Sequence, residues 1–230
     1  MFKRSLFFLL VSFSFFLKGQ ISVDTINRTI DTTKNIRKKI TKIYSLSKNR
    51  TLTPSDLEFL KTKMLDVAAV SAKKSDKGFA YYQFAVLCST KKKHNEAIKY
   101  GFDALKIAEQ TKDTALVFRC LYRLGVAYKD LNNIPYSKKY FYNALNYATL
   151  INNDEDLVSI YNYFGTIYKN ADILDSALFY NKKALVLRLK LGDKKGIATT
   201  YNNIGLVYKK QKNYDLALTY LQKALTLRVQ

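Results

Sequence analysis

Few residues of this chain have the types and spacing that catalysis or metal binding requires. The 230 residues include one histidine, His94, so there is no second imidazole for a catalytic dyad or a metal site, and we interpret it as a solvated turn residue. Acidic residues such as Asp113, Asp154 and Asp193 stand where helices are expected to begin, where a carboxylate complements the helix dipole. The glycines stand singly, so they form no phosphate-binding loop. The sequence therefore predicts a protein that is not an enzyme and uses no cofactor and no metal.

The positions that these residues occupy are set by an internal repeat. Three glycines recur at intervals of 40 residues, each followed by a tyrosine three residues later and by an alanine nineteen residues later. These residues are Gly125, Gly165, Gly205, Tyr128, Tyr168, Tyr208, Ala144, Ala184 and Ala224. A fourth, weaker copy has Ala85 and Cys88 at the glycine and tyrosine positions. A fixed period of this length indicates an array of similar structural units.

Each copy has the pattern of two helices that bury their apolar faces against each other. Residues 198–210 carry Tyr201, Ile204, Gly205 and Tyr208 at the spacing of one helical stripe, and the residues after the turn 211–213 repeat that spacing. A glycine within a helix costs about 1 kcal/mol relative to alanine. Glycines in register therefore predict helix pairs that pack too closely for a side chain at that level.

This pattern resembles the consensus of the tetratricopeptide repeat (TPR) family, in which a large residue, Leu-Gly and Tyr precede Ala, an aromatic residue and Ala. The matching residues are Tyr201, Ile204, Gly205, Tyr208, Ala217, Leu221 and Ala224. The resemblance covers roughly residues 78–228 and implies an all-α fold, a right-handed α-solenoid of stacked helix-turn-helix repeats. The family's closing proline is absent, Ser137 replaces one alanine, and the period of 40 exceeds the common value of about 34. The longer period is similar to that of the TPR sensory regions of exported bacterial sensor kinases and transcription regulators.

We expect the array at residues 77–230, with repeats at about 78–113, 118–153, 158–193 and 198–230. A pair of capping helices is expected within residues 20–76. The isoleucines of residues 21–46 follow a helical spacing among basic residues, which favours a capping helix, with a basic amphipathic helix on anionic lipid as the alternative. Thr53-Pro54-Ser55-Asp56 has the residues that begin a second helix.

Residues 1–19 have the pattern of a cleaved export signal. Lys3 and Arg4 precede an apolar and serine-containing run from Ser5 to Leu17, and Gly19 supplies a small residue for cleavage. The run is shorter than the approximately 20 apolar residues of a membrane span. We therefore expect export to the periplasm or the cell envelope.

The net charge of +21 would by itself suggest nucleic acid or an anionic surface as partner. The lysines, however, are spread over almost every predicted helix, which indicates a solvated surface, and nucleic acid is not expected.

Cys88 and Cys120 raise the question of a disulfide in an exported protein. In the repeat register they would lie roughly 12 Å apart along stacked helices at about 1.5 Å per residue. A disulfide needs a Cα separation of about 4.4–6.8 Å. We predict two buried thiols.

In TPR arrays the first helix of each repeat lines an inner groove. The resemblance implies that the matching positions here form a peptide-binding groove: Tyr82, Tyr122, Lys129, Asn162, Lys169, Asn202, Asn203 and Lys209. Asparagine amides both donate and accept hydrogen bonds, and lysines attract carboxylates, so such a groove suits an extended acidic peptide. Since asparagine and lysine are frequent throughout the chain, a general compositional bias is the alternative.

The predicted function is a non-catalytic scaffold for protein–protein interaction in the bacterial envelope. It would bind a peptide or partner segment in the concave TPR groove. The alternative is the exported sensory region of a longer sensor kinase or transcription regulator, with membrane contact only through a downstream segment. The last helix carries an apolar strip that predicts end-to-end self-association or a C-terminal continuation, formed by Leu218, Leu221, Leu225, Leu227 and Val229.

Overall fold

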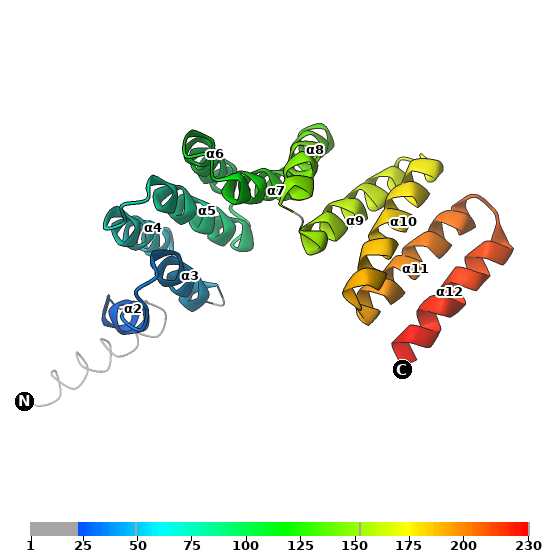
Figure 1. Cartoon of the computed structure of the whole chain (residues 1–230), viewed down its shortest axis with the longest axis horizontal. Helices are drawn as coiled ribbons and strands as arrows, with labels where there is room; N and C mark the ends of the chain where they lie inside the picture. Colours follow the sequence, from blue (N-terminus) through cyan, green and yellow to red (C-terminus); the bar gives the residue numbers. More distant parts are fainter. Residues whose placement is uncertain (1–22, 49, 152, 230) are drawn as a thin grey trace, which may run out of the picture. The chain divides into compact units, whose positions relative to one another are not determined.

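The computed structural model describes residues 23–48, 50–151 and 153–229, and the regular elements of these residues are all helices (Figure 1). They are α2 (Val23–Ile30), α3 (Ile36–Ser47), α4 (Pro54–Ala69), α5 (Lys74–Thr90), α6 (His94–Gln110), α7 (Thr114–Asp130), α8 (Ile134–Leu150), α9 (Asp154–Asn170), α10 (Leu174–Leu191), α11 (Lys194–Lys210) and α12 (Tyr214–Val229). The predicted all-α fold of helix pairs is confirmed. In this part of the chain, none of the helices combines the length and apolarity that crossing a membrane requires. The predicted export signal lies outside the described residues.

The chain divides into two compact units, the first ending at Tyr140 and the second beginning at Phe141, within α8. In the first unit α3 packs against α4 and α5, and α5, α6 and α7 pack against one another in sequence. In the second unit α9 packs against α10, α10 against α11, and α11 against α12. The first helices of successive pairs, α9 and α11, also touch.

From α5 onward a helix begins every 20 residues, so each 40-residue repeat consists of two equal halves. The turns between helices share one backbone geometry, in which one residue takes a φ between 52° and 68°: Lys92, Lys112, Asn132, Asp172, Gly192 and Lys212. The residue that follows donates its N–H to a carbonyl of the last helical turn, as in Asp113 N to Ala108 O at 3.0 Å. This is the Schellman arrangement that ends helices.

The joints between repeats cap the next helix as the sequence predicts. The side chains of Asp113, Asn153 and Asp193 accept hydrogen bonds from the backbone N–H groups of Leu116, Asp156 and Gly196. These bonds satisfy donors that a helix start leaves free. The register of the joints thus follows from three short polar residues.

The repeated glycines lie where the paired helices approach most closely. A Cβ placed on Gly165 would lie 2.8 Å from Asn181 Cγ, and one on Gly205 would lie 2.9 Å from Leu221 Cγ. At Gly125 the contact is polar, because Ser137 Oγ donates to the Gly125 carbonyl at 2.8 Å. The predicted close packing at the glycine level is confirmed at Gly165 and Gly205.

Of the segment expected to form one helix, the described residues 23–46 are divided between two helices. Helix α2 ends at Ile30, and Asn35 begins α3 by accepting a hydrogen bond from Lys38 N at 2.9 Å. The apolar spacing continues across this break, which is why the sequence pattern does not reveal it. Ile26, Ile40 and Ile43 are fully buried in the protein, so these side chains are not exposed for contact with lipid.

Helices α3 and α4, which the sequence predicts to be caps, continue part of the 40-residue register of the repeats. Helix α4 begins with the predicted capping box, in which Thr53 Oγ1 accepts from Asp56 N and Asp56 accepts from Thr53 N. Its buried residues stand 40 positions before buried alanines of α6: Leu57, Met64 and Ala68 precede Ala97, Ala104 and Ala108. Leu57 and Met64 are larger than the alanines at the equivalent positions of α6, whereas Ala68 is the same residue as Ala108.

The apolar strip predicted on the last helix is smaller than expected. Leu218 and Leu225 are 58% and 62% exposed. Leu221, however, packs against Gly205 of its own pair, and Leu227 lines a pocket beside α11. Among the described side chains the exposed strip on α12 therefore consists of Leu218 and Leu225, and the predicted contribution of Val229 lies outside them.

Candidate functional site

The sequence predicts that the single histidine lies in a turn. This prediction is wrong. His94 is the first residue of α6 and is half-buried. Within the described residues there is no group of three or more His, Cys, Asp or Glu side chains that could hold a metal ion.

The predicted pair of thiols is confirmed. Cys88 and Cys120 are both buried and free. Burial raises the pKa of Cys88 to about 12 and raises that of Cys120 as well. A thiol reacts as the thiolate, so neither cysteine is suited to nucleophilic chemistry in the folded protein.

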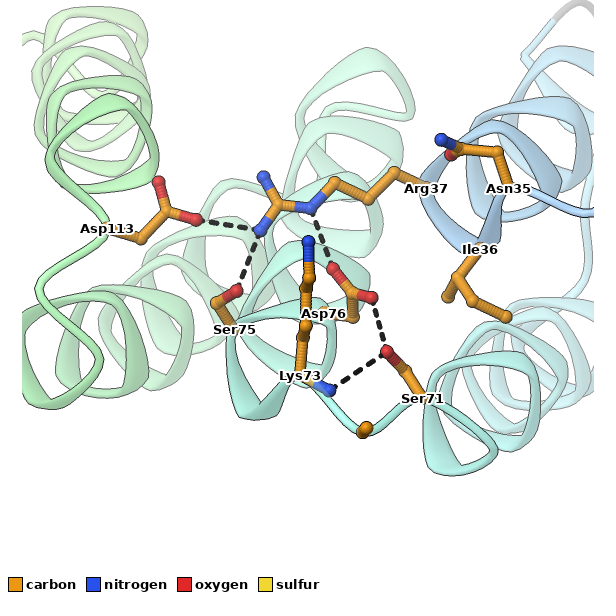
Figure 2. Close-up of a pocket in the computed structure, with 9 residues that line it drawn as sticks. Asn35, Ile36, Arg37, Ser71, Lys73, Ser75, Asp76 and Asp113 are labelled. Atoms are coloured by element: carbon orange, nitrogen blue, oxygen red, sulfur yellow. Dashed lines mark hydrogen bonds and ion pairs between the residues drawn. The ribbon is translucent and has the colours of Figure 1, made fainter.

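A polar pocket of about 630 Å³ lies where α3, α5 and α7 begin (Figure 2). Arg37 of α3 donates from Nε to Asp76 Oδ1 at 2.8 Å and from Nη2 to Asp113 Oδ2 at 2.7 Å. Its Nη2 also donates to Ser75 Oγ at 2.9 Å, and Ser71 Oγ donates to Asp76 Oδ2 at 2.6 Å. The guanidinium lies 5.1 Å from the centre of the buried Phe79 ring.

The Arg37 cluster joins α3 to the starts of α5 and α7. Burial alone would raise the pKa of Asp113, but hydrogen bonds from Arg37 and from Leu116 N outweigh it and hold the pKa below its ordinary value. The polar groups of the cluster satisfy one another, as expected of a structural contact. From sequence Asp113 is predicted only to cap a helix, because its partner Arg37 lies 76 residues away.

The groove residues predicted in the first unit lie on α5 and α7, which touch each other. Tyr82 is half-buried, and burial raises its pKa while Arg123 and Arg119 act in the opposite direction. Tyr122 is half-buried, with its ring centre 6.1 Å from that of Phe118. Lys129 is exposed and pairs with Asp130 at 3.3 Å. These tyrosines are therefore partly committed to packing.

The second unit presents a more regular face. Asn162 and Lys169 on α9 stand 40 residues before Asn202 and Lys209 on α11. Seven residues are about two helical turns, so the amide and the ammonium lie on the same side of each helix. The Asn162 Oδ1 atom has no hydrogen-bond partner among the described residues. We call these four residues the Asn/Lys face.

Asn203 does not belong to this face. At the equivalent positions of earlier repeats, Tyr163 packs against Phe141 of α8, and Gln83 donates to Thr41 of α3 at 3.3 Å. In those repeats this position is directed towards the preceding helices, and Asn203 lies about 100° around the helix axis from Asn202.

Two further pockets, which the sequence does not predict, lie on another side of α9 and α11. One, of about 370 Å³, lies between α9 and α10 and is lined by Leu157, Tyr161, Phe179, Lys182, Lys183, Val186 and Leu187. The other, of about 550 Å³, has α11 as its floor and is lined by Leu189, Ile197, Tyr201, Thr219, Gln222, Lys223, Thr226 and Leu227. We call them the lysine-rimmed pockets.

The two pockets are equivalent sites of successive repeats. Leu157, Tyr161, Lys183 and Leu187 recur 40 residues later as Ile197, Tyr201, Lys223 and Leu227. The lysines lie against aromatic rings: Lys183 Nζ is 4.6 Å from the Phe179 ring centre, and Lys223 Nζ is 5.4 Å from that of Tyr220. This recurrence is visible in the sequence. The sequence does not show, however, which of these residues the neighbouring helices leave uncovered.

Residues 198–228 match the family model of the tetratricopeptide repeat. No curated protein sequence matches the chain. Solved structures match over most of its length. BtubC (BKLC) from P. vanneervenii is 20% identical, with a TM-score of 0.76 over 90% of this chain and 89% of that one.

Aspartyl phosphate phosphatase F from Bacillus subtilis is 17% identical, with a TM-score of 0.63. The match covers 89% of this chain but only 63% of the phosphatase. A protein of nearly identical TPR-like repeats from Podosopora anserina is 8% identical, with a TM-score of 0.62 over 85% of this chain and 97% of that one. At these identities the likeness concerns the fold alone. The chain therefore carries a tetratricopeptide repeat at residues 198–228, and its helices have the fold of proteins built from TPR-like repeats.

Proposed function

We propose that the protein is a non-catalytic scaffold that binds an extended, acidic segment of a partner protein on the Asn/Lys face. The observation that carries the proposal is the recurrence of an amide and an ammonium at one register on two touching helices, α9 and α11. Stacked repeats form extended surfaces of this kind, and partner proteins bind to them.

The side chains of the Asn/Lys face have unused capacity for hydrogen bonds and charge. Asn162 Oδ1 is buried and lacks a donor, and a turn of the amide towards the surface would let it accept a backbone N–H of a bound peptide. Neither Lys169 nor Lys209 has an ion-pair partner among the described residues. Carboxylates of a bound segment would pair with these two ammonium groups.

The place of action that fits this proposal is the bacterial envelope. It rests on the sequence of residues 1–19, with its basic start, apolar run and small residue at Gly19. Mass spectrometry of the mature protein from envelope extracts should find an N-terminus at Gln20. A mature protein that retains Met1, or that stays in the cytoplasm, would contradict export.

Peptide binding can be tested on an array of synthetic 12-residue peptides that carry either Asp and Glu or Asn and Gln at alternate positions. We expect the acidic peptides to bind, and the double variant Lys169→Glu/Lys209→Glu to weaken the tightest of them by about tenfold or more. The matched control is Lys38→Glu/Lys106→Glu, which changes the net charge equally at two exposed positions of the first unit. If both variants lose the same affinity for the acidic peptide, or if no peptide binds the wild type, the Asn/Lys face is rejected as the site.

A further inference from the structure

We propose that the lysine-rimmed pockets form a second interaction surface, which binds an acidic amphipathic segment of a partner protein. This surface is distinct from the Asn/Lys face. Tyr161 and Asn162 are neighbours in sequence on α9, so their side chains lie about 100° apart around the helix axis. A ligand on one face therefore leaves the other free.

The pockets and the surface around them are apolar, which requires a partner with apolar side chains. Phe179, Val186 and Leu189 of α10 are 52%, 65% and 53% exposed. The volumes of about 370 and 550 Å³ fall within the range of about 300–1,000 Å³ that is typical of ligand pockets. Covering these side chains would remove apolar surface from water, which favours association.

The charge of the pockets selects an acidic partner. Lys182, Lys183 and Lys223 line them, and the lining includes no acidic side chain. None of the three lysines has an ion-pair partner among the described residues. The aromatic rings beneath Lys183 and Lys223 hold the ammonium groups beside the apolar floor. A partner segment that places Asp or Glu next to Leu or Phe would satisfy both features.

Two other occupants fit less well. A second copy of this chain would bring a further net charge of +21 to a surface that is already positive. Nucleic acid would match the charge but would leave the aliphatic floor of Leu157 and Leu187 without an apolar partner. An acidic amphipathic protein segment matches charge and apolarity together.

The test uses a defined probe, a fluorescein-labelled synthetic helix of about 14 residues (four turns) with Leu and Phe on one side and Glu on the other. Two control peptides separate its features: one has Lys in place of Glu, and one has Ser in place of Leu and Phe. Fluorescence polarisation would be measured with the wild-type chain and with Val186→Glu/Thr226→Glu, which places a carboxylate in each pocket. Val186 and Thr226 are exposed, so the fold should persist, and circular dichroism checks this.

The matched protein control is Thr166→Glu/Thr199→Glu. It adds the same charge at two exposed positions of α9 and α11 that do not line the pockets. We expect the acidic amphipathic peptide to bind the wild type and this control alike, and to lose about tenfold or more in affinity in Val186→Glu/Thr226→Glu. Bound peptide should also slow the acetylation of Lys183 and Lys223 but not that of Lys38.

Several outcomes would overturn the proposal. The first is that the lysine or serine peptide binds as tightly as the acidic amphipathic peptide. The second is an unchanged affinity of that peptide for Val186→Glu/Thr226→Glu. The third is that a single-stranded oligonucleotide displaces the probe as well as the unlabelled acidic peptide does. Lys169→Glu/Lys209→Glu serves to separate the two proposals. If only Lys169→Glu/Lys209→Glu loses binding of the probe, the probe binds the Asn/Lys face and the pockets are rejected as its site. If only Val186→Glu/Thr226→Glu loses binding, the pockets are supported whether or not the Asn/Lys face binds a peptide.

Discussion

Asn181 is a polar residue in the core of the pair formed by α9 and α10. Its side chain is 1% exposed, and Nδ2 donates to the Ala177 carbonyl at 2.9 Å, while Oδ1 has no partner among the described residues. In the next repeat the same position is Leu221, which packs against Gly205. A leucine therefore fits this geometry without the polar atoms.

We expect Asn181→Leu to raise the free energy of unfolding by about 1 kcal/mol, because an unsatisfied buried acceptor costs about 1–3 kcal/mol. Urea denaturation would measure the change. The reverse exchange, Leu221→Asn, should lower the free energy of unfolding. A less stable Asn181→Leu variant would show that Oδ1 has a partner, such as a bound water.

The Arg37–Asp113 pair should make stability depend on pH. The folded-state pKa of Asp113 lies below its ordinary value, so the stabilisation is present above about pH 4 and is lost as the pH falls through the folded-state pKa. Asp113→Asn keeps a residue that caps helices well but removes the charge.

The difference in Tm between the wild type and Asp113→Asn should therefore be largest near pH 6 and shrink towards pH 3. In an Arg37→Met background, most of the pH dependence should disappear. A constant difference in Tm across this range would mean that the ion pair does not stabilise the fold.

At the scale of elements, the turns set the 20-residue spacing of the helices. Each turn requires one residue with positive φ, and five of the six described positions are not glycine. The left-handed region costs other residues about 1–2 kcal/mol, and glycine avoids that cost. Lys112→Gly should therefore raise the free energy of unfolding by about 0.5–1 kcal/mol.

Thermal denaturation checks this expectation, with Lys106→Gly as the control. Lys106 lies within α6, where glycine should destabilise by about 1 kcal/mol. If both substitutions destabilise equally, the turn at Lys112 does not require a positive φ.

The repeated part of the fold follows from the sequence because identical spacing recurs in it. The close packing at Gly165 and Gly205, the helix starts at Asp113 and Asp193, and the paired helices are predicted correctly. The N-terminal region is less predictable, since Leu57 and Met64 replace the alanines that mark a repeat and no glycine or proline marks the end of α2.

The candidate sites are predictable only in part. Sequence register places Asn162 with Asn202 and Lys169 with Lys209, whereas Asn203 is grouped with them only because it is adjacent in sequence. The Arg37 cluster joins residues from three helices, and the lysine-rimmed pockets depend on what neighbouring helices leave uncovered. Contacts between distant helices and surface that neighbouring helices leave uncovered have no local signal in the sequence.

At the scale of the whole molecule, the flank of α12 differs from that of the earlier second helices. Leu105 of α6 is 8% exposed, whereas its equivalent in α12, Leu225, is 62% exposed. No described residue covers Leu225 to the degree that Leu105 is covered. Leu218 and Leu225 therefore leave apolar surface in water.

We expect the isolated chain to self-associate through this flank when salt screens its net charge of +21. Light scattering should show a mass that increases with salt concentration. Leu218→Glu/Leu225→Glu should remain monomeric, whereas Leu150→Glu/Leu191→Glu, at exposed positions outside the α12 flank, should behave as the wild type. A salt-independent monomer would contradict this expectation.

The 20-residue step also has a consequence for how the chain folds. Most helix contacts join neighbours in sequence, so the contact order is low and a helix pair can form before the rest of the chain is available. Opening should then begin at the ends and move inward, as hydrogen exchange would record. The Arg37–Asp113 bond is an exception, because it joins residues 76 positions apart and closes only after three helices have assembled. It would therefore act late in folding, and its rupture would be an early step in the unravelling of the N-terminal end.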